Sequence, residues 1–216
     1  MANALTSNAS TEKLGRWLGQ LSDTKKLKLA LKKLEKADIA GESRAEVFKN
    51  AFSCVAYGSM AEAMLALKYY EGISKTQPQE QEENVVELSF WQIRWAQLNG
   101  KMDRQLIAMV EKIAAKLSLE QKKAFFAKVT LLTSHNLMHT VFNLRFFEAH
   151  KALVQQDPES TAWSKDEADM GVKTLQSRLA SITQRRSNQS KTLAKFNAGL
   201  KELVKVQKQT VEAVAP

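Results

Sequence analysis

The stretch VKTLQSRLASITQRRSNQSKTLAKFNAGLKELVKV, residues 172–206, decides the fold class. From its first valine, a pattern of alternating steps of three and four residues marks out one face of a helix. The pattern continues to Val214 and is mostly apolar. Arg186 and Gln189 interrupt it, as polar core residues do in coiled coils, where they fix the register at a cost in stability. We therefore expect one long, coiled-coil-like helix over residues 165–211.

The apolar residues of this pattern form a heptad seam, which we expect to pack within the chain or against a partner. The heptad seam comprises Leu175, Leu179, Ile182, Leu193, Phe196, Leu200 and Leu203. A seam sustained over so many turns is typical of helices that pack lengthwise against another helix.

Basic residues crowd the same helix, and Glu202 is the only acid between residues 173 and 208. They are Lys173, Arg178, Arg185, Arg186, Lys191, Lys195, Lys201, Lys205 and Lys208. Except for Arg186, they fall at outward or flanking heptad positions. One interpretation is a solvated face that keeps the protein soluble. The alternative is a rod of cations that follows phosphates on nucleic acid or an anionic membrane. No aromatic residues alternate with the cations, so base stacking is not predicted.

The remainder of the chain also favours helices. Capping boxes begin at Ser43, Ser118 and Ser164, each with Glu or Gln three residues later. We expect helices at about residues 11–38, 43–71, 83–99, 101–117 and 119–156. The expected breaks are a kink near Ser22-Asp23, then Gly41, Gly72, Asn99-Gly100 and Asp157-Pro158.

These features predict an all-α fold, an elongated helical bundle of five or six helices that ends in the long C-terminal helix. We expect residues 1–216 to form a single all-helical domain, with a flexible N-terminus at 1–10 and a polar loop at 73–82. Only 8 glycines and 3 prolines are present in 216 residues. An all-β fold needs turn residues far more often than that.

The three histidines of the chain lie in a short run, SHNLMHTVFNLRFFEAH, residues 134–150. His135 and His139 are four residues apart, so on a helix they share a face and could bind zinc together. His150 is too far along the helix to join them, and no residue stands out as a third ligand. The same histidines fall on a partly polar seam of an otherwise apolar helix. We therefore favour packing within the bundle over a metal site.

Trp91 and Trp95, one turn apart in FWQIRWAQ (residues 90–97), are candidates for interface anchors. Core packing is the more common fate of such residues. The small-residue stretch at 51–70 predicts close helix packing, with membrane insertion after a rearrangement as the alternative. Cys54 lies in this stretch and is the only cysteine, so no internal disulfide is expected.

The sequence has no secretory signal, no apolar stretch of membrane-spanning length and no motif typical of enzymes. We expect a cytoplasmic protein without a cofactor, metal or small-molecule substrate, with export by a signal-independent route as the alternative. The leading hypothesis is a non-enzymatic helical protein that mediates protein–protein assembly, through a protein partner or self-association. Two alternatives are a sequence-nonspecific nucleic-acid-binding protein that uses the basic face of 173–208, and a soluble component of a membrane-acting helical system.

Overall fold

The computed structural model describes most of the chain. The described residues are 12–21, 23–36, 43–76, 81–133, 136–157, 159 and 164–214. Their side chains are described as well, except those of 75–76, 81–83, 136 and 202–214. The N-terminus expected to be flexible, residues 1–10, lies outside the described residues, and so does Gly41.

Helices make up nearly all of this structure, and no strand occurs among the described residues, which confirms the all-α prediction. Residues 12–19 are helical. The helices that follow are α2 (Thr24–Lys36), α3 (Arg44–Phe52), α4 (Met60–Thr76), α5 (Gln81–Leu98), α6 (Asp103–Ala114), α7 (Leu119–Thr130), α8 (Asn136–Gln156) and α9 (Lys165–Val214). The long C-terminal helix is therefore present as α9.

The three predicted capping boxes are confirmed. The Oγ atom of Ser43 accepts a hydrogen bond from the Glu46 amide, and the Glu46 carboxylate accepts one from the Ser43 amide at 2.8 Å. Ser118 caps α7 and Ser164 caps α9 by the same reciprocal pair of hydrogen bonds. Each pair satisfies two amides that lack a partner inside the helix, which fixes where these helices begin.

The predicted helix at 43–71 is wrong, because residues 53–59 separate α3 from α4. Gly58 has a φ of 78°, a conformation that glycine adopts without steric cost. The Ser59 hydroxyl accepts a hydrogen bond from the Glu62 amide, and the Glu62 carboxylate accepts one from the Gly58 amide. The pattern Ser-x-x-Glu at Ser59 is thus a further helix start, which the sequence analysis overlooked.

The predicted helix at 119–156 is also wrong, since α7 ends at Thr130 and α8 begins at Asn136. The Thr130 hydroxyl donates to the Phe126 carbonyl, and the Thr133 hydroxyl donates to the Thr130 carbonyl. Such hydrogen bonds offer backbone carbonyls an alternative to the helical partner, so clustered threonines favour a helix end. Because of these two breaks, the described helices are more numerous and shorter than expected.

The predicted polar loop at 73–82 begins too early. Helix α4 continues through Gly72 to Thr76, and Ile73 is buried at 8 % exposure. A glycine inside a helix lowers the stability of the helix by about 1 kcal/mol, and burial of the Ile73 side chain offsets this loss at Gly72. Residues 77–80 lie outside the described residues. The predicted turn at Asn99-Gly100 is confirmed, with a φ of 78° at Gly100.

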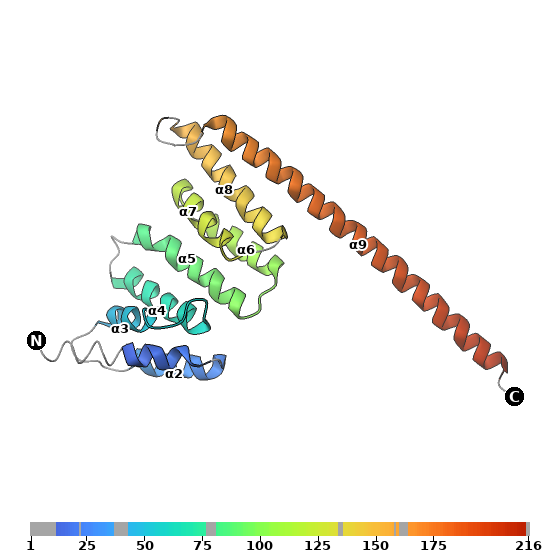
Figure 1. Cartoon of the computed structure of the whole chain (residues 1–216), viewed down its shortest axis with the longest axis horizontal. Coiled ribbons are helices and arrows are strands. Elements are labelled where there is room, and N and C mark those ends of the chain that lie inside the picture. Colours follow the sequence, from blue (N-terminus) through green and yellow to red (C-terminus); the bar gives the residue numbers. More distant parts are fainter. Residues whose placement is uncertain are drawn as a thin grey trace, which may run out of the picture.

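The helices stack in chain order into an elongated body (Figure 1). Helix α3 packs on α4, α4 on α5, α5 on α6 and α7, and α7 on α8. Two main clusters of buried apolar residues run through the body. One lies within α5–α8 and includes Ile93, Val110, Phe125 and Phe142, and the other lies within residues 14–69 and includes Leu27, Leu31, Phe48 and Leu65.

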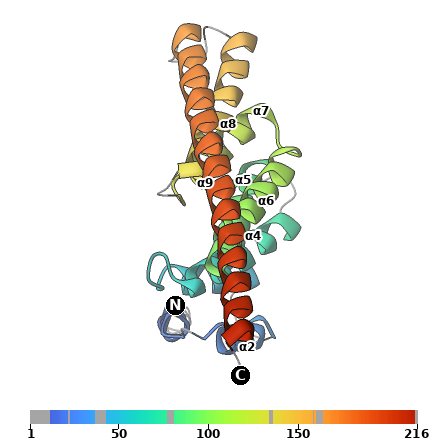
Figure 2. The same ribbon diagram turned by 90° about the vertical axis from the view of Figure 1, so that its right-hand side faces the viewer.

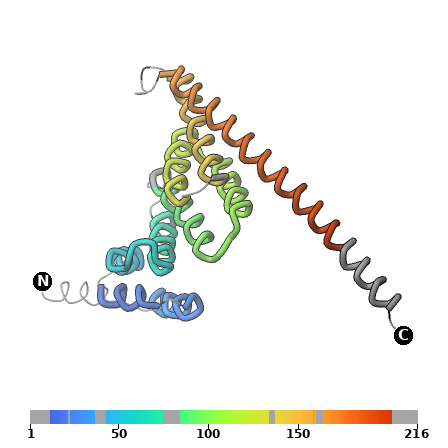
Figure 3. The backbone as a smooth tube through the Cα atoms, turned by 45° about the vertical axis from the view of Figure 1, so that its right-hand side comes forward, coloured from blue at the N-terminus to red at the C-terminus, as the bar shows by residue number. Residues whose placement is uncertain are grey.

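Helix α9 begins beside α8 and then leaves the body (Figure 1, Figure 3). Turned by 90°, the molecule shows α9 spanning the full height of the body (Figure 2). The two ends of this helix therefore lie in different environments.

Candidate protein-binding surface on the C-terminal helix

The first turns of α9 are part of the body. Ala168 is fully buried and Val172 is 9 % exposed. Gly171 faces Phe147 of α8 so closely that a Cβ atom at Gly171 would lie 2.5 Å from the phenyl ring. Lys151 of α8 forms an ion pair with Asp169. Close helix packing and this ion pair fix the direction in which α9 leaves the body.

Further along α9, the side chains are no longer covered by the body. Every side chain from Thr183 to Lys201, a segment that we call the far half of α9, is exposed. This exposure includes Leu193, Phe196 and Leu200, which are 59 %, 63 % and 48 % exposed. These three residues follow the same three-four spacing, so they lie together on one face of the helix. Large apolar side chains grouped in this way mark a binding surface more often than a scattered exposed leucine does.

The structure divides the heptad seam into two parts. Leu175, Leu179 and Ile182 are partly buried at the end of α9 that contacts α8. The next members of the seam are the exposed residues of the far half, and the Leu203 side chain lies outside those described. A pattern that is continuous in the sequence therefore packs within the chain at one end and faces solvent at the other.

The far half of α9 is a poor helix by itself. It contains Ser187, Asn188, Ser190 and Asn197, whose side chains compete for backbone hydrogen bonds. A threonine in the same segment also forms such a hydrogen bond, since the Thr192 hydroxyl donates to the backbone carbonyl of Asn188 at 3.0 Å. Because the segment has no acid, it cannot form the i,i+4 ion pairs that support exposed helices. Without tertiary contacts such a helix is marginal in water, so a partner would stabilise it.

The basic residues of the same helix are displayed, as their heptad positions predict. Lys173, Arg178, Arg185, Arg186, Lys191, Lys195 and Lys201 are all exposed, whereas the side chains of Lys205 and Lys208 lie outside those described. The far half carries five of these cations, from Arg185 to Lys201, and no acid lies between Asp169 and Glu202. This rod of like charge attracts anionic partners over about a Debye length.

Of the three histidines, the structure describes His139 and His150. His135 lies outside the described residues, and no three His, Cys, Asp or Glu side chains of the described part are placed to hold a metal ion. The Nδ1 atom of His139 lies 3.2 Å from both the hydroxyl and the carbonyl oxygen of Thr133, at the start of α8. His150 is 2 % exposed, and its ring stacks on Phe146. Both described histidines thus have packing roles.

Burial lowers the pKa of His150, and the nearby positive charge of Lys123 on α7 lowers it further. Both effects favour the neutral form of the imidazole inside the body.

Trp91 and Trp95 occupy different environments. Trp91 is 9 % exposed and packs edge-on against Phe52 and Phe90, so it belongs to the core. Trp95 is partly buried, and the Lys28 ammonium lies 5.4 Å from the centre of its ring. Trp91 is therefore a core residue and not an exposed interface anchor. Trp95 makes a cation–π contact with α2.

Two further exposed apolar side chains, missed from the sequence, lie near the N-terminus. Trp17 is 53 % exposed and Leu29 is 58 % exposed. The exposure of Leu29 could have been predicted from the sequence. Leu27, Leu31 and Leu34 lie on one face of α2, and Leu29 lies on the opposite face.

Within the described residues, no helix is both long enough and apolar enough to cross a bilayer. Comparisons of the chain with protein-family models, curated proteins and solved structures gave no match.

Proposed function

We propose that this chain is a non-enzymatic, cytoplasmic assembly protein whose far half of α9 binds a helix of a partner protein. The observation that carries the proposal is the exposure of Leu193, Phe196 and Leu200 on a helix segment without tertiary support. A partner helix that packs on this face buries the three side chains, and pairing by heptads forms a short coiled coil. The body then serves to hold and orient the far half of α9.

The positive charge of the far half of α9 indicates which kind of partner helix it would bind. Arg185 flanks the apolar face, Lys191 and Lys195 lie on the outer side of the helix, and no acid offsets these charges. Two copies of the chain carry the same positive charge along this segment, and their repulsion disfavours self-pairing. An amphipathic helix with acidic residues beside its apolar face complements both the shape and the charge. We therefore propose an acidic amphipathic helix as the partner.

A synthetic peptide of four heptads tests this proposal. The peptide has Leu at the a and d positions and Glu at e and g, and it carries a fluorophore for anisotropy. Titrated with the full chain, it should bind, and the double variant Leu193→Asp/Leu200→Asp should weaken binding at least about tenfold. A peptide with Lys in place of Glu is the matched control and should not bind.

Because both substituted leucines are exposed and outside the core, the double variant should keep the wild-type melting temperature of the body. Equal binding by the wild type and the double variant would exclude the apolar face as the docking surface. Sedimentation velocity tests whether a second copy of the chain binds this surface instead. A dimer of the full chain that the double variant loses would assign the surface to a second copy and overturn the acidic partner.

The charge of the far half supports nucleic acid binding as a second candidate function. The cations from Arg185 to Lys201 are spread over about 24 Å of helix and could follow a phosphate backbone. The test is a salt titration of binding to labelled single- and double-stranded DNA. Micromolar affinity near physiological salt, lost in the variant Arg185→Glu/Arg186→Glu/Lys191→Glu, would place this function first. Binding seen only at low salt and unchanged in that variant would leave the protein-binding proposal in place.

A further inference from the structure

A second unusual surface lies on α2, far from α9 along the chain. Leu27, Leu31 and Leu34 are buried, so the opposite face of α2 points to solvent. Leu29 stands at the centre of that outward face and is 58 % exposed. Its neighbours on the helix surface are the residues three and four positions before and after it. All four are exposed lysines, namely Lys25, Lys26, Lys32 and Lys33.

The two acids that the structure describes on or beside α2, Asp23 and Glu35, already have partners. The Asp23 carboxylate accepts hydrogen bonds from the amides of Lys25 and Lys26 at the start of α2. Glu35 forms an ion pair with Lys68 of α4, on the side of α2 that faces the body. The four lysines around Leu29 form no ion pair with any acid in the part of the chain that the structure describes. The outward face of α2 therefore presents a dense positive charge around one apolar side chain.

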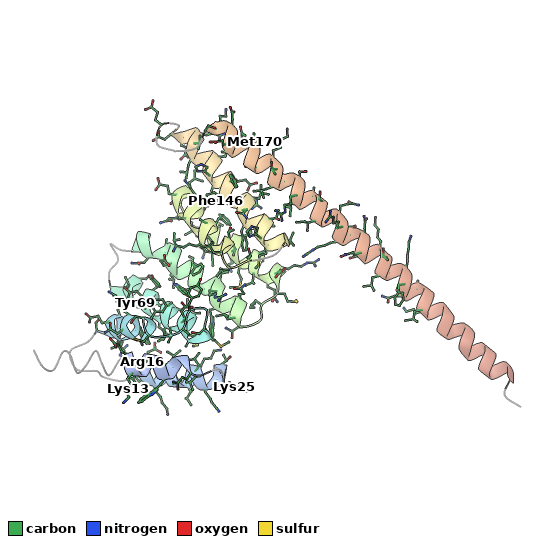
Figure 4. All side chains as sticks on the ribbon, in the orientation of Figure 1. Lys13, Arg16, Lys25, Tyr69, Phe146 and Met170 are labelled. Carbon is green, nitrogen blue, oxygen red and sulfur yellow. The ribbon has the colours of Figure 1, made fainter. Side chains whose placement is uncertain are left out.

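The helix at 12–19 adds an exposed indole to the same end of the molecule. Trp17 is 53 % exposed, and the Lys13 ammonium lies 5.2 Å from the centre of its ring. Figure 4 places Lys13, Arg16 and Lys25 together at this end, away from the junction of α8 and α9. Lysine with exposed tryptophan and leucine is the composition of helices that lie in the headgroup region of a bilayer.

We propose that this end of the molecule, α2 with Trp17, docks on the surface of a bilayer that contains anionic lipid. The lysines around Leu29 bind lipid headgroups, and the side chains of Leu29 and Trp17 enter the boundary between headgroups and acyl chains. A bilayer matches both the charge and the apolar centre of this face. Nucleic acid matches only the charge, because a phosphate backbone gives Leu29 no apolar surface to contact. This inference is independent of the function proposed for α9.

Sedimentation of the full chain with vesicles tests the proposal. Vesicles of phosphatidylcholine with about 30 % phosphatidylserine should bind the protein, and vesicles of phosphatidylcholine alone should bind it much more weakly. The variant Lys25→Gln/Lys32→Gln/Lys33→Gln should lower the affinity about a hundredfold, since each lysine near an anionic surface contributes about fivefold. The matched control removes the same charge from α9, Arg185→Gln/Arg186→Gln/Lys191→Gln, and should lower the affinity much less.

The Leu29→Gln variant separates the apolar contribution to vesicle binding from the electrostatic contribution. It should weaken vesicle binding about fivefold and leave the salt dependence unchanged, because it removes apolar contact and no charge. All substituted side chains are exposed, so the melting temperature of each variant should equal that of the wild type. Brominated acyl chains should quench the fluorescence of the wild type more than that of Trp17→Phe, which places this indole at the bilayer.

Three results would overturn the proposal. The first is equal binding to the two kinds of vesicle, and the second is an equal loss of affinity in the α2 variant and its α9 control. The third is binding to a labelled DNA duplex that depends on the three lysines, with vesicle binding that does not depend on Leu29. That last result would assign the outward face of α2 to nucleic acid.

Discussion

Gly15 shows how a single residue sets the distance between two helices. A Cβ atom at Gly15 would lie 2.4 Å from the carbonyl oxygen of Ala51 in α3 and 2.8 Å from its Cα atom. Ala51 is fully buried, so neither backbone can withdraw without opening the core around it. Gly199, in the far half of α9, offers the opposite case, because nothing lies within 4 Å of its added Cβ atom.

Alanine at these two glycines should therefore have opposite effects. Gly15→Ala should lower the free energy of unfolding by about 1–3 kcal/mol, which is the usual cost of overpacking a core. Gly199→Ala should leave the urea midpoint unchanged and raise the helical signal in circular dichroism, because alanine is the better helix former by about 1 kcal/mol. An unchanged urea midpoint in Gly15→Ala would contradict the close contact with α3.

His150 links the stability of the body to pH. Its folded pKa lies below the ordinary value of 6.5, since burial and Lys123 both disfavour the imidazolium. In the unfolded chain the imidazole takes up a proton as the pH falls through 6.5, whereas the folded protein resists it. This difference favours unfolding, so the contribution of His150 to stability is complete above pH 6.5 and is lost below it.

We therefore expect the urea midpoint to fall between pH 7.5 and pH 5.5, and to fall less in His150→Leu. Lys123→Gln should also reduce the pH dependence, because it removes one of the two causes of the shifted pKa. A pH dependence that is identical in the wild type and His150→Leu would show that other groups cause it.

Among the helices, α9 allows the clearest test, because the same face of this helix is buried at one end and exposed at the other. Val172 and Leu193 are both a positions of the same heptad pattern, yet Val172 is 9 % exposed and Leu193 is 59 % exposed. An aspartate at a buried position leaves a charge without solvent or partner, and one at an exposed position does not.

Val172→Asp should accordingly lower the free energy of unfolding by more than about 2 kcal/mol, whereas Leu193→Asp should leave it within about 0.5 kcal/mol of the wild type. Thermal melts of the two variants, followed by circular dichroism, measure the difference. Similar losses of stability in both variants would mean that the far half of α9 packs on the body after all.

Helix starts were the elements that the sequence predicted best, because a capping box is a local arrangement. Ser43, Ser118 and Ser164 needed only a residue three positions later to fix their helices. The helix ends at Phe52 and Thr130 were missed for different reasons. The first is followed by a capping pattern at Ser59 that was overlooked, and the second depends on threonine hydroxyls whose hydrogen bonds can also form inside a helix.

The candidate surface could be predicted only in part. The heptad seam and the outward cations follow from spacing alone, so Leu193 and Lys191 were identified from the sequence. Which part of the seam packs inside the chain could not be predicted, because it depends on the length of α8. Helix α8 has 21 residues and α9 has 50, so α9 continues beyond the helix that covers its first turns. A pattern within one segment carries no information on the length of its neighbour.

The whole molecule has an elongated body with two separate exposed surfaces. The outward face of α2 is at the end of the body away from the α8–α9 junction, and the far half of α9 projects from the body (Figure 1). The first combines cations with Leu29 and Trp17, and the second combines cations with the heptad seam. Separate variants can therefore disable one surface and leave the other intact.

The protein-binding proposal requires that the far half of α9 is uncovered in the free chain. Hydrogen–deuterium exchange by mass spectrometry tests the claim directly, at a concentration where sedimentation shows a monomer. Amides from Thr183 to Lys201 should exchange at least about a hundredfold faster than those of α8 and of the first turns of α9, because no packing protects them. They should slow when the acidic heptad peptide is added. Amides of the far half that are as protected as those of α8 in the free monomer would contradict the account.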